Sequence, residues 1–340
     1  MSNSTEERGL PLTEVLRKLL LCSTYILVSS VLIRFNKVMM QPDHFPFALA
    51  LSCSHMVVAS IMSALLYAVA PSRFPAMEGT KGERMSLMKW FVPIGVCFSV
   101  MLFGSNKAYV YCSVTLLQFM KEANVIIVFL ISCAVGLQSI NRIRVVLLVW
   151  VIASATVSVS GDMTFSKAGI AFQACSQVAE CIRVVLGEFV LSGRKLDPLT
   201  YTAFVAPTSL IFLSLACACT WDPLILPALL QSRNLVLLNG LVAFVLNVMV
   251  AMIIKEISAV GFILTGLTKD VVIVSLSCIV FGDPITRIQC LGFVATLIGI
   301  GFWSLLKIRP NALPVQLMEK MLCVPKKNPG EDSALLEKGV

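Results

Sequence analysis

Two lysines stand in similar local sequences, each in the middle of a long apolar stretch. Residues 118–127 read Gln-Phe-Met-Lys-Glu-Ala-Asn-Val-Ile-Ile around Lys121, and residues 266–274 read Gly-Leu-Thr-Lys-Asp-Val-Val-Ile-Val around Lys269. A lysine at the centre of a bilayer costs roughly 2.5–3.5 kcal/mol on insertion scales. Two such costs at matching positions need a reason, and an anionic solute held between the two segments is the simplest one.

The composition places these lysines in a membrane. Of the 340 residues, 57% are hydrophobic and 14% are charged, and the mean hydropathy is +0.88. Soluble chains are about 45–50% apolar and about a quarter charged. The excess lies in runs near the ~20 residues that a helix needs to cross a bilayer, where only helices and closed barrels satisfy the backbone. We therefore predict an all-α polytopic membrane protein.

The apolar runs predict about ten transmembrane helices within a transporter domain at residues 16–306. Nine spans remain the alternative, because the third and fourth runs are nearly continuous. Residues 1–15 form the N-terminus, and residues 307–340 form a polar, flexible tail. The expected spans are 16–35, 45–70, 89–106, 111–136, 143–160, 166–190, 200–220, 233–254, 258–282 and 287–306.

The loop charges predict an orientation and argue against nucleic-acid binding. About two thirds of the 27 Lys and Arg residues lie in the termini and in the loops near 71–88, 137–142, 191–199 and 255–257. By the positive-inside rule both termini are cytosolic. The start of the chain resembles neither a signal peptide nor a transit peptide, which favours the endomembrane system. The Golgi is favoured, with the ER, endosomes or an outer plastid-type membrane as alternatives.

The two lysines also predict a repeat. Lys121 falls in the fourth span and Lys269 in the ninth, and copies five spans apart have opposite orientations in the membrane. Two inverted five-helix repeats, about 16–160 and 166–306, follow. Transporters of this kind bind substrate near the midplane at the repeat interface. Each lysine is about ten residues into its span, or roughly 15 Å deep.

Helical spacing adds polar neighbours to the lysines, and each of them has a structural alternative. The sixth span carries a stripe that contains Glu180 and Arg183, which either faces a water-filled cavity or neutralises itself as an i,i+3 ion pair. Asn247 and Asn239 in the eighth span either face the cavity or join helices. The lysines themselves are either substrate ligands or charges compensated by the acid that follows each. The remaining candidates on the lysine faces are Gln118, Thr265 and Thr268.

Other chemistry has little support in the sequence. The 12 cysteines form no Cys-x-x-Cys pair, and neither histidine has a partner pattern, so we expect no metal and no cofactor. The sequence shows neither a nucleophile with a base nor a phosphate-binding glycine loop, and we expect no enzyme activity.

Several motifs resemble the triose-phosphate and nucleotide-sugar translocators of the drug/metabolite transporter superfamily. The first span ends Phe-Asn36-Lys37, which is similar to the Tyr-Asn-Lys ending of that family. Residues 106–121 are similar to its fourth-span entrance. The pairs Glu180-x-x-Arg183 and Lys269-Asp270 resemble the plant "probable sugar phosphate/phosphate translocator" branch. The resemblance runs from about residue 20 to residue 306.

This resemblance implies roles for matching residues. Plastid phosphate translocators grip phosphate with a lysine in span four and a Lys-Arg pair in span nine, with an arginine in span six. Lys121, Lys269 and Arg183 match, whereas Asp270 stands where the second span-nine cation is expected. A compact dianion such as triose phosphate therefore fits less well than a larger substrate whose hydroxyls Asp270 can accept hydrogen bonds from.

The expected function is a membrane antiporter working by alternating access. It would exchange a sugar phosphate or nucleotide sugar for phosphate or a nucleoside monophosphate. The partners are a small anionic solute, its counter-substrate and the lipid bilayer, with no nucleic acid; a homodimer stays open. One alternative is a proton-coupled exporter of small metabolites or drugs, with Glu180 or Asp270 as the working acid. Another is a membrane receptor or scaffold that transports nothing.

Overall fold

A computed structural model describes most of the chain, and every regular element in the described part is a helix. The described residues are 11–112, 117, 120–121, 124–138, 140–158, 166–269, 287–308 and 312–321. Five helices in this part are long and apolar enough to cross a membrane, and three shorter apolar helices accompany them. The predicted all-helical membrane class is confirmed at this level, while the count of ten spans and the repeat stay predictions.

The longer helices match the predicted spans to within a few residues at most ends. The third helix, Arg84–Tyr111, begins before the predicted span 89–106 and ends after it, because the helix continues beyond the apolar run at both ends. In chain order the elements are α1 (Leu12–Met39), α2 (Ala48–Val69), a 3₁₀ turn (Pro71–Arg73), α3 (Arg84–Tyr111), α5 (Asn124–Ala134), α6 (Arg142–Ser158), α7 (Lys167–Glu188) with a π-helical end (Phe189–Gly193), α8 (Pro198–Cys219), α9 (Ile225–Gln231), α10 (Arg233–Glu256), a helix at Ala259–Lys269, α12 (Arg287–Ile308) and α13 (Leu313–Met321).

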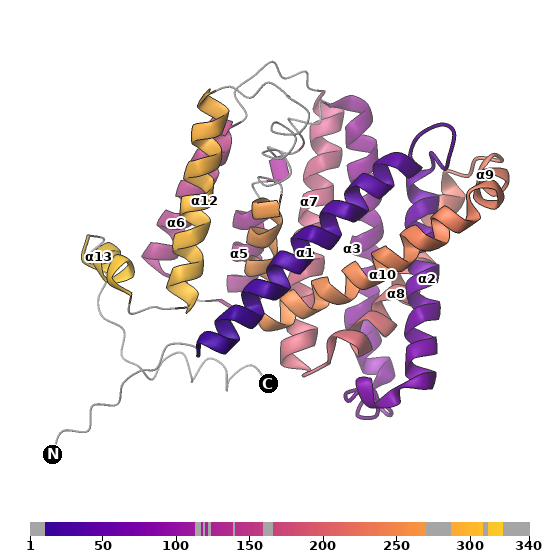
Figure 1. Ribbon diagram of the computed structural model, residues 1–340, viewed down its shortest axis with the longest axis horizontal. Coiled ribbons are helices and arrows are strands. Elements are labelled where there is room, and N and C mark those ends of the chain that lie inside the picture. Colours follow the sequence, from indigo (N-terminus) through magenta and orange to yellow (C-terminus); the bar gives the residue numbers. More distant parts are fainter. Residues whose placement is uncertain are drawn as a thin grey trace.

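The helices pack in pairs that join distant parts of the sequence. The pairs with the most extensive contact are α3 with α7, α6 with α12, α2 with α8, α3 with α8, α2 with α10, and α1 with α10. Figure 1 shows α6 and α12 at one edge of the bundle and α2 at the other, with α1 crossing in front. Two glycines permit close approach: a Cβ on Gly104 would lie 2.9 Å from the Phe172 carbonyl oxygen, and one on Gly240 would lie 2.7 Å from Val58.

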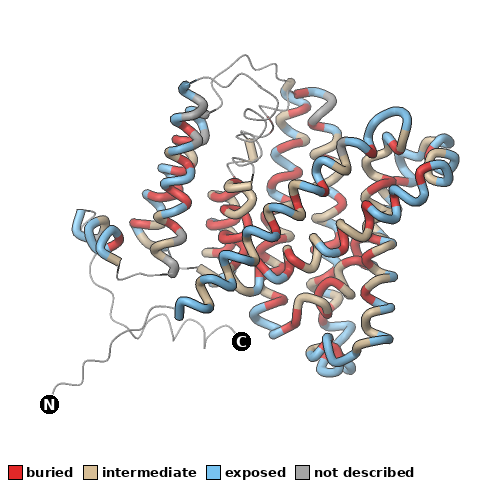
Figure 2. Tube along the Cα trace, viewed as in Figure 1, coloured by how far each residue is buried: buried red, intermediate tan, exposed pale blue. Residues whose placement is uncertain are grey.

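Apolar side chains lie both inside the bundle and on its outer surface. Phe91, Ile94 and Val184 are fully buried at the centre, while Leu20 and Leu27 of α1 are 69% and 64% exposed. Figure 2 shows this contrast between the outward face of α1 and the buried faces of α5 and α7. Large exposed apolar faces are unusual in a soluble monomer and suit contact with lipid.

The two ends of the bundle differ in charge. The end of the bundle where α1 and α3 begin and where α2 and α10 end is called the charge-rich end. The opposite end is called the charge-poor end. At the charge-rich end Arg17 of α1 donates to Glu256 of α10 across 2.5 Å. Figure 1 shows the charge-poor end at the top, with α9 beside it. The exposed ion pair ties the two helices together but is worth little by itself, since water screens it.

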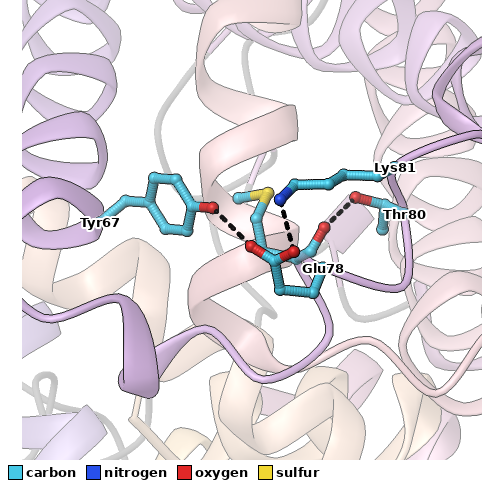
Figure 3. A network of polar contacts seen from close by, with 5 residues as sticks. Tyr67, Glu78, Thr80 and Lys81 are labelled. Atoms are coloured by element: carbon cyan, nitrogen blue, oxygen red, sulfur yellow. Dashed lines mark hydrogen bonds and ion pairs between the residues drawn. The ribbon is translucent and has the colours of Figure 1, made fainter.

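The loop between α2 and α3 is ordered by its own polar contacts. Tyr67 Oη donates to Glu78 Oε1 across 3.3 Å and Lys81 Nζ donates to Glu78 Oε2 across 2.5 Å, while Thr80 Oγ1 donates to the Met77 carbonyl oxygen (Figure 3). The hydrogen bond from Lys81 lowers the pKa of the Glu78 carboxyl. This carboxyl therefore stays ionised over a wider pH range than a free glutamate.

Asp197 docks this loop on the start of α8. Its carboxylate accepts from the backbone N–H of Thr200 at 2.8 Å, as the N-cap of the helix, and from the backbone N–H of Ala76 at 3.1 Å. Pro198 at the first helical position adds a fixed backbone angle. The Asp-Pro pair thus begins a helix, as its sequence indicates.

Candidate substrate-binding site

The polar stripe on α7 faces two neighbouring segments. Ser176 Oγ donates to the Met101 carbonyl oxygen of α3 across 2.7 Å. Gln177 Nε2 donates to the carbonyl oxygen of Met120, the residue before Lys121. Interhelical hydrogen bonds of this kind join helices in an apolar environment. The backbone next to Lys121 is therefore held against the middle of α7.

Glu180 and Arg183 do not form the ion pair that their i,i+3 spacing suggests. Both are described, and no ion pair joins them. Glu180 Oε2 instead accepts from Asn124 Nδ2 of α5 at 2.9 Å, and Arg183 lies over the ring of Phe98 with its guanidinium carbon 5.0 Å from the ring centre. Of the two alternatives for this stripe, the i,i+3 ion pair is not formed in this structure, and partners from α5 and α3 contact the two side chains instead.

Arg183 borders a small, partly open cavity of about 30 Å³. Its Nε is buried and has no hydrogen-bond partner in the described part of the chain. The other polar residues on the wall are Tyr201, Thr202 and Asn247, from α8 and α10. A space of this size holds about two waters. A cation with a free donor beside such a space is suited to an anion or an ordered water.

The two asparagines of α10 have different surroundings. Asn247 lines the cavity beside Arg183. Asn239 is fully buried elsewhere, where it donates through Nδ2 to Asn36 Oδ1 of α1 at 2.9 Å and accepts from Nε2 of His55 on α2. Asn239 is therefore a link between three helices, and only Asn247 remains a candidate ligand.

The segment that carries Lys269 is anchored to α7 and α1. Glu188 at the end of α7 is buried and accepts from the backbone N–H of Ala259 at 2.7 Å, which caps the start of this helix. Tyr25 of α1 meets Phe262 edge to face, with ring centres 5.8 Å apart. Helix α7 thus contacts both lysine-bearing segments, through Gln177 on one side and Glu188 on the other.

The remaining predicted residues divide between the described part of the chain and the rest. Lys121 and Lys269 are both half-buried. The Thr265 and Thr268 hydroxyls donate to carbonyl oxygens of their own helix, those of Gly261 at 2.8 Å and Leu264 at 3.1 Å. Gln118 and Asp270 lie outside the described residues.

Three contacts of this region were not expected from the sequence. Tyr201 lines the cavity, Asn124 holds Glu180, and His55 bonds to Asn239. Asn124 carried a signal, because it lies one turn after Lys121 on the same face. Tyr201 and His55 are isolated polar residues in apolar runs, and their roles depend on which helices become neighbours.

Comparisons with known proteins agree with this architecture. The model of the Triose-phosphate Transporter family matches residues 16–304. A probable sugar phosphate/phosphate translocator of Arabidopsis thaliana is 29% identical over 294 residues, covering 82% of this chain and 85% of that protein. UDP-galactose transporter 1 of the same plant is 23% identical and covers 79% of this chain and 81% of that protein.

A solved structure supports the fold independently. A protein crystal structure superposes with a TM-score of 0.62 at 12% identity, covering 87% of this chain and 99% of the other. At 12% identity the structural similarity supports the fold and nothing about function. The helical arrangement described above is thus one that a crystallised chain also adopts.

Proposed function

The chain belongs to the triose-phosphate transporter family, and we propose that it is an antiporter that exchanges a sugar phosphate or nucleotide sugar for phosphate or a nucleoside monophosphate. Lys121 and Lys269 hold the anionic group of the substrate, and Arg183 assists them. The observation that carries this proposal is the buried Nε of Arg183, which has no hydrogen-bond partner among the described residues and lies beside a small cavity within the bundle.

The departure of Asp270 from the family pattern favours a substrate larger than a triose phosphate. An acid next to Lys269 lowers the positive charge available to a phosphate dianion and offers an acceptor to hydroxyl groups. The neutral polar residues around Arg183 act in the same direction, since Tyr201, Thr202 and Asn247 can meet hydroxyls or a base. A sugar phosphate with several hydroxyls or a nucleotide sugar fits this combination.

The pairing of the helices supports an inverted repeat. If the two proposed repeats are superposed on each other, α1 corresponds to α7, α2 to α8, α3 to α10 and α6 to α12. Under this correspondence the α1–α10 contact is equivalent to the α3–α7 contact, and the α2–α8 and α6–α12 contacts are each equivalent to themselves. All four contacts are present. Alternating access about a midplane site is the mechanism such a repeat permits.

The charge of the site favours exchange over one-way transport. A bound dianion would offset most of the positive charge of Lys121, Lys269 and Arg183, whereas the empty carrier would hold that charge in a region of low dielectric, where it is unfavourable. The occluded state is therefore accessible mainly to the loaded protein. Return of the carrier then requires a counter-substrate.

The proton-coupled alternative has one observation in its favour. Glu180 lies in the middle of α7, and in the described part of the chain its carboxylate accepts a hydrogen bond from the neutral amide of Asn124 and forms no ion pair with Arg183. An intramembrane acid without a cationic partner is a candidate proton carrier. A response of transport to an imposed proton gradient, absent in Glu180→Gln, would favour this alternative.

The proposal is tested by counter-exchange in proteoliposomes. Vesicles are loaded with phosphate, with UMP or with nothing, and are offered labelled glucose 6-phosphate or UDP-galactose. Uptake only into phosphate-loaded vesicles identifies a sugar-phosphate translocator, and uptake only into UMP-loaded vesicles identifies a nucleotide-sugar antiporter.

Two variants make that assay specific for the site. Lys269→Ala is expected to lose exchange, while Lys255→Ala, which changes an exposed lysine at the charge-rich end of α10, retains it. Equal uptake into empty vesicles that Lys269→Ala leaves unchanged would contradict the proposal.

We further propose that the protein resides in the endomembrane system with both termini cytosolic. Protease protection of tagged termini in sealed vesicles tests this orientation.

A further inference from the structure

A second, larger pocket lies at the charge-poor end of the bundle. Its volume is about 240 Å³, and it is formed by the start of α2, the last turns of α3 and the end of α8 with α9. Two phenylalanines, Phe47 and Phe103, stand on its wall together with the polar residues Asn106, Lys107 and Thr220. None of the residues assigned to the substrate site lines it, so the pocket is separate from that site.

The neighbourhood of the pocket marks the depth of a membrane surface. Trp221, Leu224 and Leu230, which lie just after α8 and on α9, are 57%, 65% and 63% exposed. Tryptophan and short apolar helices with exposed side chains collect where hydrocarbon meets headgroups. Because Thr220 and Ile225 from the same segment line the pocket, the pocket opens at the headgroup level of the bilayer.

The pocket lining has an apolar part and a polar, basic part, which match the acyl chain and the headgroup of a phospholipid. Its apolar part, with Phe47, Phe103 and small alanines of α2, can accommodate the upper part of an acyl chain. Lys107 is exposed at the rim, and no hydrogen bond or ion pair joins it to another described residue. An ammonium group at headgroup depth attracts a phosphate, whereas a soluble sugar gains little from an aromatic and aliphatic wall.

We propose that this pocket binds an anionic phospholipid, with its negatively charged headgroup at Lys107 and Asn106 and the start of its acyl chain between α2, α3 and α8. The site touches α2 and α8, which form one of the contacts between the two proposed repeats. Occupancy therefore stabilises that contact, and the lipid composition of this leaflet influences the stability of the carrier.

Titration of the purified full-length protein with lipids, read by native mass spectrometry, tests the site. Phosphatidylserine is compared with phosphatidylcholine, and glycerol 3-phosphate serves as the soluble phosphate. We expect phosphatidylserine to bind about fivefold more tightly, since two opposite unit charges about 4 Å apart in water attract each other by about 1 kcal/mol. The preference should disappear in Lys107→Gln and persist in Lys167→Gln, a matched exposed lysine at the same end of the bundle.

A pocket-filling variant separates the pocket from surface charge. Ala48→Phe is expected to weaken binding of both lipids while the transition temperature in detergent stays that of the wild type. Retention of the phosphatidylserine preference by Lys107→Gln would overturn the proposal. Displacement of the lipid by millimolar glycerol 3-phosphate would also overturn it, because the site would then belong to a soluble phosphate. Neither result bears on exchange activity, so the proposed function is judged separately.

Discussion

Replacement of Asn239 and Asn247 by alanine should separate stability from transport within one helix. The two residues share a type and a helix and lie eight positions apart on α10. Asn239 is fully buried and joins α1 and α2 through hydrogen bonds with Asn36 and His55. Asn247 lines the cavity beside Arg183. The same substitution therefore removes an interhelical link in one case and a cavity wall in the other.

The expected magnitudes follow from these contacts. Interhelical hydrogen bonds in membrane proteins average about 0.6 kcal/mol each, so the loss of two costs about 1.2 kcal/mol. The polar atoms left on Asn36 and His55 add roughly 1–2 kcal/mol if they stay buried and unpaired. We expect Asn239→Ala to destabilise the protein by about 1–3 kcal/mol. Asn247→Ala should cost less than about 0.5 kcal/mol, since the Asn247 side chain lines the cavity and makes no hydrogen bond to another described residue.

Thermal unfolding in detergent and initial uptake rates in proteoliposomes measure the two effects. Asn239→Ala should lower the transition temperature by several degrees and leave the KM of the reconstituted fraction near that of the wild type. Asn247→Ala should keep the transition temperature and raise the KM. The reverse pattern, or equal effects of both substitutions on both measurements, would refute the assignment of Asn239 as a link and Asn247 as a candidate ligand.

Three further outcomes follow from the structure. Arg183→Leu should reduce kcat/KM about 10- to 100-fold, the range for one charge-assisted hydrogen bond, with Arg183→Lys intermediate because it lacks the planar fork; wild-type rates in Arg183→Leu would exclude a substrate role. Asp197→Ala should destabilise the protein by about 1–2 kcal/mol through loss of the α8 cap, measured by thermal unfolding, and an unchanged transition would contradict the docking of the α2–α3 loop. Gly104→Val should cost about 1–3 kcal/mol by forcing α3 from α7, whereas Gly301→Val on α12, where an added Cβ meets nothing within 4 Å, should cost much less; equal or greater loss at Gly301 would dispute the close contact.

Features set by nearby residues were predictable from the sequence. The apolar runs predict helices because each must satisfy its own backbone in lipid. The polar stripe of α7 was also predictable, since 3.6 residues per turn place Ser176, Glu180 and Arg183 near one face.

Features set by distant residues were not predictable in the same way. Local spacing suggests that Glu180 pairs with Arg183, but Asn124, 56 positions earlier, takes the carboxylate instead. Asn239 and Asn247 look equivalent until α1 and α2 supply partners for one of them, and the bond from Asn239 to Asn36 spans 203 positions. These choices depend on which helices pack together, and a single sequence gives no direct measure of that.

The most direct test of the exchanger is efflux from proteoliposomes loaded with a labelled organic phosphate. Efflux is measured with and without an external counter-substrate, using the wild type beside Lys121→Ala and Lys269→Ala. The account predicts rapid efflux only when counter-substrate is present, and loss of that stimulation in both variants. Efflux that is equally fast without counter-substrate, or stimulation that survives in both variants, would contradict a cationic site that must be neutralised before the carrier turns over.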